Sequence, residues 1–363
     1  QSLSRKKRAQ KQIKKLHLML PMQISENEII KRLIISEASF LTLKEKTLLQ
    51  KKLDSFNDIA LMSNKELSSI INRSLIKTAW DGKKVLKKAQ TANFLMQKFG
   101  IRWSFFGDSD YPALLTEMKD SPYVIFYRGN LDCLKANCVS MVGTRRATFT
   151  GKNAAFDFAR EASDNGETVI SGLAYGIDIA SHRGALAGKS AKTAAVLPGG
   201  IDSIVPAGHS KTAVQIVENG GLILSEYTPG TPAQPFRFVQ RNRIIAALSP
   251  ATVVVQAPAG SGAMITAGLA LDYNRYVFFH EACFNQEAKA LDAINAQKLS
   301  AMALREKNGQ KKAYAKSLNS PERYVSEGAP VVKNYAEYCA LKNEDFCGIN
   351  LKKDNGQLNL FID

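Results

Sequence analysis

An Arg-Asn-Arg triplet at residues 241–243 stands directly against a long apolar stretch. Burying an unpaired cation is expensive, so the sequence predicts that Arg241 and Arg243 lie at a helix start and face outward. A guanidinium in that position can hold an anion such as a phosphate through two parallel hydrogen bonds. The alternative is that one of the two arginines pairs with an internal carboxylate, Asp178 or Glu226.

Five segments rich in Gly, Ser, Thr or Arg each follow a predicted strand. Glycine lets backbone N–H groups approach a ligand closely, and a helix N-terminus adds a partial positive charge, so such segments suit anionic groups. Arg145 and Arg146 lie in the first segment, and Lys192 comes just before a predicted strand, so we expect all three on one rim with the triplet. The segments are GTRRATFTG (143–151), SGLAYGID (171–178), PGGID (198–202), SEYTPGTPAQPFRFVQRNR (225–243) and APAGSGAMIT (257–266).

The motifs that would indicate catalysis or a cofactor are not found in the sequence. It has no GxGxxG after the first strand, no P-loop, no GxSxG, no HExxH and no zinc-deaminase signature. Of four histidines, His182 is predicted to be packed or hydrogen-bonded. Ser171 and Ser261 have no visible base and are expected to hydrogen-bond phosphate. Five cysteines without CxxC spacing indicate inert thiols. We therefore expect no catalytic residue, no metal site and no cofactor.

Short apolar strands alternate with helical patterns from residue 138 onward. The predicted strands are CVSMVG, ETVISG, TAAVLPGG, GLILSEY, ATVVVQA and YVFFHE. Strands that are apolar throughout, separated by helices, are typical of a parallel sheet covered on both faces. The fold class is therefore α/β, with a Rossmann-like doubly wound domain at 101–335 that includes a lead-in segment at 101–137.

The N-terminal part is different in charge and pattern. Residues 1–138 carry a net charge of +12, out of +16 for the whole chain. Residues 1–20 are a basic tail, predicted to be disordered, and 21–100 are predicted to form a small helical domain that ends at Gly100. A Lys- and Ala-rich insertion is expected at about 285–325, followed by a short element and polar tail at 336–363. No membrane span or signal peptide is apparent, which favours a cytoplasmic location.

The order of the motifs resembles the DNA-processing protein A family (DprA, also called Smf). The resemblance covers roughly residues 85–280 and rests on VGTRRAT, ISGLAYGIDIASHRGAL, TAAVLPGGID, the segment from ILSEYTPG to ATVVVQA, and SGAMITAGLALDYNRYVFF. It implies a single-stranded DNA-binding protein, usually dimeric, that protects incoming DNA and delivers it to a RecA-type recombinase in natural transformation. Our first hypothesis is therefore a non-enzymatic single-strand binder. It also implies a SAM-like domain at 21–100.

Matched motif by motif, the resemblance implies a DNA-binding set, to which the rim argument adds Arg146. The candidate residues are Gly143, Thr144, Arg145, Arg146, Ser171, Gly172, Gly176, Asp178, Lys192, Arg241, Asn242, Arg243, Ser261, Gly262 and Thr266. Phe149, Tyr175, Phe236 and Phe238 lie in or near the same loops and are candidates for base stacking.

The C-terminal part departs from the family pattern. FFHEACFN stands where the family usually has Val-Pro-Gly, and the insertion follows it. The chain after residue 335 is too short for the winged-helix domain that some members carry, so none is expected.

Two other interpretations stay open. An enzyme that acts on small nucleotides, by cleaving a nucleotide or hydrolysing a phosphoribosyl bond, could bind phosphate with the same loops and use Glu226 as the acid. A family member kept for protein contacts alone would bind no DNA.

Overall fold

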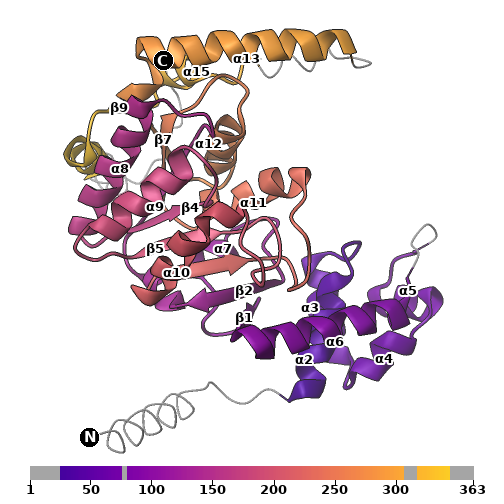
Figure 1. Cartoon of the computed structure of the whole chain (residues 1–363). Coiled ribbons are helices and arrows are strands. Elements are labelled where there is room, and N and C mark those ends of the chain that lie inside the picture. Colours follow the sequence, from indigo (N-terminus) through magenta and orange to yellow (C-terminus); the bar gives the residue numbers. More distant parts are fainter. Residues whose placement is uncertain (1–24, 76–79, 306–316, 344–363) are drawn as a thin grey trace, which may run out of the picture. The chain divides into compact units, whose positions relative to one another are not determined.

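The computed structural model describes residues 25–75, 80–305 and 317–343. They form two compact units, with the boundary between Phe94 and Leu95 (Figure 1). The predicted basic tail at 1–20 and the polar tail from residue 344 onward lie outside the described residues. Among the helices that are described, none combines the length and apolar character needed to span a bilayer.

The first unit is made of helices. The longer helices are α2 (Glu26–Glu37), α3 (Leu43–Lys52) and α6 (Gly82–Phe99), and the shorter ones are α4 (Phe56–Leu61) and α5 (Asn64–Ile71). Gly100 has φ +60° and ends α6, which confirms the predicted stop. That this unit is a SAM-like domain stays a prediction.

Short polar signals begin the helices of the first unit. Thr42, Ser55 and Ser63 each cap a helix and exchange hydrogen bonds with an acid three residues later, as in a capping box. Arg73 donates to one of these acids, Glu45, and together with the Thr42 N–H it lowers the pKa of that carboxyl to about 2. Each helix start is thus determined by its own few residues.

The second unit contains a nine-stranded sheet in the order β1-β2-β6-β5-β4-β3-β7-β8-β9. The strands from β3 to β8 are the six predicted ones and are mutually parallel, which confirms the α/β class. The predicted lead-in segment supplies β1 and β2, which pair antiparallel with each other, and β2 also pairs antiparallel with β6. The strand bounds are β1 (Arg102–Phe105), β2 (Val124–Gly129), β3 (Cys138–Gly143), β4 (Thr168–Ser171), β5 (Thr193–Val196), β6 (Leu222–Ser225), β7 (Ala251–Gln256), β8 (Tyr276–His280) and β9 (Val331–Val332).

Helices cover both faces of this sheet (Figure 1). One core joins the sheet to α11 and α12, and the other joins it to α8, α9 and the helical residues 335–343. The helix bounds are α7 (Ala113–Thr116), α8 (Phe149–Asp164), α9 (Ile177–Ala187), α10 (Ser210–Glu218), α11 (Pro235–Ala247), α12 (Gly262–Asp272), α13 (Gln286–Arg305) and α15 (Pro321–Ser326), with single turns η1 (Leu131–Lys135), η2 (Ala207–His209) and η3 (Glu281–Cys283).

The direction of winding reverses beside β3. The chain runs outward through β4, β5 and β6, then returns to place β7 on the other side of β3. At such a switch point the loops after the two strands lead to helices on opposite faces, and a crevice opens between them at the carboxyl edge. Here the loops are those between β3 and α8 and between β7 and α12.

The thiols lie in the packed regions. Cys133, Cys138 and Cys283 are buried and Cys339 is half-buried, all unpaired, while Cys347 is outside the described residues. Burial raises the pKa of each of the three buried thiols to about 12. These four sulfurs are structural, as predicted.

Candidate nucleic-acid interface

The loop between β3 and α8 presents two free cations. Thr144 donates its N–H to the carbonyl of Gln256 at 2.7 Å and accepts the N–H of Ile177 at 3.3 Å, so the backbone is tied to β7 and α9. Arg145 and Arg146, the next two residues, are exposed. The Arg145 guanidinium lies 4.5 Å from the centre of the Phe238 ring, and no carboxylate among the described residues pairs with either arginine.

Glycine is required where this loop meets the loop after β4. A Cβ on Gly176, which has φ +80°, would lie 2.2 Å from the Thr144 carbonyl oxygen and 2.8 Å from Cα of Arg145. A Cβ on Gly143 would lie 2.3 Å from Ile177 Cγ1. The two predicted glycines therefore allow the loops to pack against each other, with the backbone at Gly176 against that of Thr144 and Arg145.

Two histidines hold the loop after β4. Leu173, at φ +55°, donates its N–H to His182 Nε2 at 3.2 Å, and its carbonyl accepts from His209 Nδ1 at 2.7 Å. The Thr193 hydroxyl donates to a strand carbonyl, so His182 Nδ1 must donate to that hydroxyl, 2.8 Å away, and the ring is neutral. Burial lowers the pKa of His182 to about 3. The predicted packed, hydrogen-bonded role of His182 is confirmed.

Arg241 is the main correction to the expected rim. It is 2% exposed, in the second turn of α11, and its Nη1 donates to the carbonyl oxygens of Gly172 at 2.7 Å and of Val196. These carbonyls follow or end β4 and β5, so the guanidinium bridges two neighbouring strand ends. Burial lowers the pKa of Arg241 to about 10, and Asp178 opposes that shift. Its Nε also donates to Asn242 Oδ1 at 3.3 Å, and these three acceptors explain how a cation can be buried here.

The space for this guanidinium comes from Gly172. A Cβ there would lie 2.4–2.6 Å from three atoms of the Arg241 guanidinium. Asp178 lies nearby in the same buried region and accepts the N–H of Ala174 at 3.4 Å. Burial raises the pKa of Asp178, an effect that the charge of Arg241 reduces. Gly172 and Asp178 therefore support the buried arginine and are not exposed phosphate contacts.

Arg243 is paired internally, as the alternative interpretation allowed. Its Nη2 donates to Glu226 Oε2, and its Nη1 donates to the carbonyl of Asp120 at 2.7 Å. Asp120 also accepts from the Tyr273 hydroxyl at 2.7 Å. The network joins α11 to the lead-in segment. It also occupies Glu226, the acid proposed for a nucleotide-cleaving enzyme.

Three other predicted residues use their side chains inside the fold. The hydroxyl of Ser171 donates to the Met141 carbonyl at 2.7 Å, and that of Thr266 donates to the Gly262 carbonyl at 3.1 Å. Asn242 donates to the same Gly262 oxygen at 3.3 Å. Ser171 and Thr266 are buried and so face no ligand, whereas Gly262 is exposed at the start of α12. Ser261 precedes it, with its hydroxyl oxygen buried and unpaired.

Lys192 lies at the amino ends of the parallel strands, whereas Arg145 lies at their carboxyl ends. It is exposed and immediately precedes Thr193, the first residue of β5, whereas Arg145 follows the last residue of β3. Because these strands are parallel members of one sheet, the start of β5 and the end of β3 are at different edges. The expectation that Lys192 shares a rim with the arginines is wrong.

Three exposed aromatic rings follow the carboxyl ends of β3, β4 and β6, at the same ends of the strands as the two arginines. Phe149 begins α8, Tyr175 follows β4, and Phe236 begins α11; their side chains are 77%, 55% and 53% exposed. Arg145, Arg146 and these three rings are called the exposed rim below. Arg237, not among the predicted residues, lies 5.4 Å from the Phe236 ring and 5.1 Å from the Tyr227 ring. The sequence feature that could have identified Arg237 is its position between two aromatic residues, Phe236 and Phe238.

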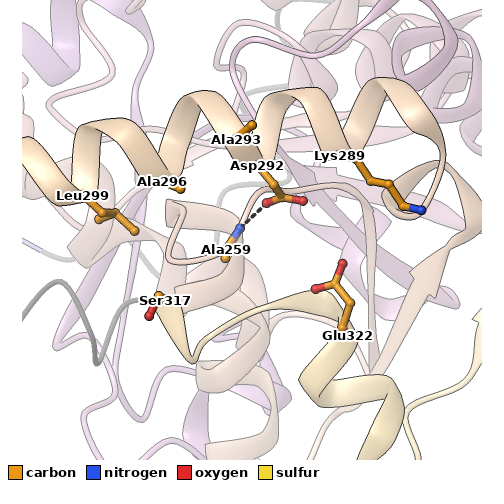
Figure 2. A pocket seen from close by; sticks show the side chains of 8 residues that line it. All are labelled: Ala259, Lys289, Asp292, Ala293, Ala296, Leu299, Ser317 and Glu322. Atoms are coloured by element: carbon orange, nitrogen blue, oxygen red, sulfur yellow. Dashed lines mark hydrogen bonds between the residues drawn. The ribbon is translucent and has the colours of Figure 1, made fainter.

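A separate cavity of about 410 Å³ lies between α13 and α15 (Figure 2). Asp292 on α13 accepts the N–H of Ala259 at 2.8 Å, and Asn295 donates to the carbonyl of the same residue at 2.6 Å. The predicted insertion thus holds the loop between β7 and α12. Within the described residues, no cluster of three or more His, Cys, Asp or Glu side chains could bind a metal ion.

Comparison with known proteins decides the family. The model of the DNA recombination-mediator protein A family matches residues 102–311, more than half of the chain. The chain belongs to this family. Smf of Borreliella burgdorferi is 32% identical over 258 residues, which are 70% of this chain and 80% of that protein. DprA of Streptococcus pneumoniae is 39% identical over 171 residues, 47% of this chain and 60% of the relative. The predicted resemblance is confirmed.

Solved structures support the same conclusion about the fold. DprA from Streptococcus pneumoniae superimposes with a TM-score of 0.60 and 26% identity, over 88% of this chain and 98% of that one. DprA from Helicobacter pylori, whose structure concerns its single-stranded DNA binding mode, gives a TM-score of 0.50 and 27% identity, over 67% and 97%. The predicted Rossmann-like fold is therefore confirmed.

Proposed function

We propose that this protein binds single-stranded DNA at the exposed rim, with Arg145 and Arg146 on the phosphates. The observation that carries this proposal is that both guanidiniums are exposed, without a carboxylate partner, on the first loop of the switch point. In doubly wound sheets ligands bind at that place. Family membership supports the choice of DNA, since the Helicobacter pylori relative binds single strands.

The rings of the exposed rim favour single strands over duplex. Unpaired bases present free faces on which Phe149, Tyr175 and Phe236 can stack, whereas the bases of a duplex are already stacked on each other. Tyr175 is held for this purpose by an edge contact with His209, 4.8 Å between ring centres. We assign the predicted Gly143, Thr144, Gly176 and Gly262 to shaping this surface.

The test replaces Arg145 and Arg146 with alanine and measures oligo-dT binding by fluorescence anisotropy over a range of salt. Each lost phosphate contact should reduce the log–log salt slope by roughly 0.7, so the double variant should lose about 1.4. The matched control is Lys189→Ala with Lys192→Ala, which removes the same charge from exposed positions before β5. Equal slopes in the two variants would refute the rim, and a wild-type protein that binds no oligo-dT would favour a role in protein contacts alone.

Glu226 provides a separate test of the enzymatic alternative. Because its carboxylate accepts from Arg243, we assign it a structural role. Turnover of nucleoside monophosphates that is lost in Glu226→Gln would contradict this assignment.

We also propose, from the family alone, that the bound strand is delivered to a RecA-type recombinase in natural transformation and that the protein acts as a homodimer. The same source supports the SAM-like assignment of 21–100 and the Rossmann-like domain at 101–335. Mass measurement in solution tests the dimer. Strand exchange by the recombinase, with and without this protein on the DNA, tests delivery.

A further inference from the structure

α6 has one solvent-facing surface made of lysines and an aromatic ring. Its 18 residues contain five lysines and no acid. At about 100° per residue, Lys83, Lys87, Phe94 and Lys98 project within roughly 60° of one another around the helix, with Lys84 beside them. All five side chains are exposed, and Phe94 is 61% exposed. These five residues are called the α6 face.

Three lysines of the α6 face, Lys83, Lys84 and Lys87, do not take part in ion pairs within the described residues. Lys88, on the flank of the helix, pairs with Glu37. The nearby Asp81 accepts the backbone N–H of Lys84 at 3.0 Å. Lysines in the first turn are repelled by the partial positive charge of a helix N-terminus, so they are unfavourable for the helix itself.

The opposite face of α6 excludes a membrane as the partner. Ala89, Ala92 and Met96 are buried, and Asn93 donates to Glu26 of α2 at 2.9 Å. An amphipathic helix binds a bilayer through its apolar side, and here that side is already packed in the protein. The basic face, which includes the exposed Phe94 ring, faces solvent.

We propose that the α6 face is a second binding site for single-stranded nucleic acid, distinct from the exposed rim. Lys83, Lys84, Lys87 and Lys98 contact the phosphates, and Phe94 stacks on an unpaired base. A row of cations interrupted by an aromatic ring is the combination that sequence-tolerant single-strand binders use. From Lys83 to Lys98 the helix rises by 15 steps of about 1.5 Å, or about 22 Å, which spans several nucleotides.

The proposal extends the proposed function, and the two can fail separately. In the full chain, Lys83, Lys84 and Lys87 are changed to Gln. The matched control changes Lys51, Lys52 and Lys65 to Gln, which are also exposed lysines of the first unit. Both variants lose the same charge, so only position distinguishes them.

Binding is measured with an oligo-dT of about 40 nucleotides, longer than single sites of up to roughly 16. In the α6 variant, the log–log slope of affinity against salt concentration should be smaller in magnitude than in the wild type by about 2. The ratio of its affinities at 50 and 200 mM salt should therefore be roughly 16-fold smaller than that of the wild type. The control variant should match the wild type. Phe94→Leu should weaken single-strand binding about 5-fold or more and leave duplex binding unchanged.

Three results would overturn the inference. They are equal slopes in the α6 and control variants, an equal loss of duplex and single-strand binding in the α6 variant, and no effect of Phe94→Leu. If Arg145→Ala with Arg146→Ala abolishes binding while the α6 variant is normal, the rim stands and this site does not. If only the α6 variant is impaired, the reverse holds. A parallel titration with oligo-rU distinguishes a DNA from an RNA preference.

Discussion

Replacing Arg241 with methionine should destabilise the fold without removing a DNA contact. Methionine keeps most of the apolar stem but cannot donate a hydrogen bond. The Gly172 and Val196 carbonyls, both served by Arg241 Nη1, would lose this donor at the ends of β4 and β5. Because the guanidinium is 2% exposed, we expect the loss to appear in stability.

The magnitude follows from those two acceptors. A buried carbonyl left without a donor costs about 1 to 3 kcal/mol, so two cost about 2 to 6 kcal/mol. Removing a buried cation also removes its desolvation penalty, which offsets part of the loss. The free energy of unfolding should therefore fall by about 2 to 4 kcal/mol.

The assay is urea unfolding followed by the fluorescence of Trp103, which lies in β1 of the second unit, in a Trp80→Phe background. The control is Arg145→Met, which should leave the urea midpoint unchanged and flatten the salt dependence of oligo-dT binding. Arg241→Met should do the opposite. A normal midpoint together with a salt slope reduced by roughly 0.7 would show that Arg241 contacts phosphate, and would refute the structural role.

Three further predictions concern the loops that follow β4 and β7 and the residues that hold them. Gly172→Ala should destabilise by about 1 to 3 kcal/mol in urea unfolding, because its Cβ would lie 2.4 Å from Arg241 Nη2; a normal midpoint would contradict this. His182 has its pKa lowered to about 3, so between pH 7 and 5 the unfolded chain binds a proton that the native ring does not. Between pH 7 and pH 5 the free energy of unfolding of the wild type should therefore fall by about 2 kcal/mol more than that of His182→Gln. Parallel pH profiles of the two proteins would disprove this. Asp292→Ala should speed hydrogen exchange at the Ala259 amide about tenfold, since a bond to a carboxylate contributes about 1.5 to 3 kcal/mol; an unchanged rate would argue against α13 holding this loop.

The parallel sheet was predictable because each of its strands is mainly apolar. β3 to β8 coincide with six mainly apolar runs without polar-apolar alternation, as expected for a sheet that is covered on both faces. The lead-in hairpin was less visible, because β1 has four residues and its outer end is exposed. α4 and α5 are short and depend on the capping residues Ser55 and Ser63 more than on a long apolar stripe.

The position of Lys192 could have been predicted from the topology alone. A residue that precedes a parallel strand lies at the amino edge, and one that follows a strand lies at the carboxyl edge. Arg145 follows β3, so linear closeness to a strand was misleading for Lys192. The burial of Ser171 and Thr266 was different, since no local pattern shows that a hydroxyl donates to the Met141 or Gly262 carbonyl.

The Arg-Asn-Arg triplet shows why polar residues that are adjacent in the sequence of a helix seldom contact the same ligand. Successive side chains of an α-helix are turned by about 100°, so residues 241, 242 and 243 face three directions. α11 starts at Pro235, which places the triplet within the helix and not at its first turn. Arg241 therefore points under the strand ends, Asn242 toward α12, and Arg243 toward Glu226. Arg145 and Arg146 precede α8 in a loop, where neighbours can face the same way, and that is why the free cations are there.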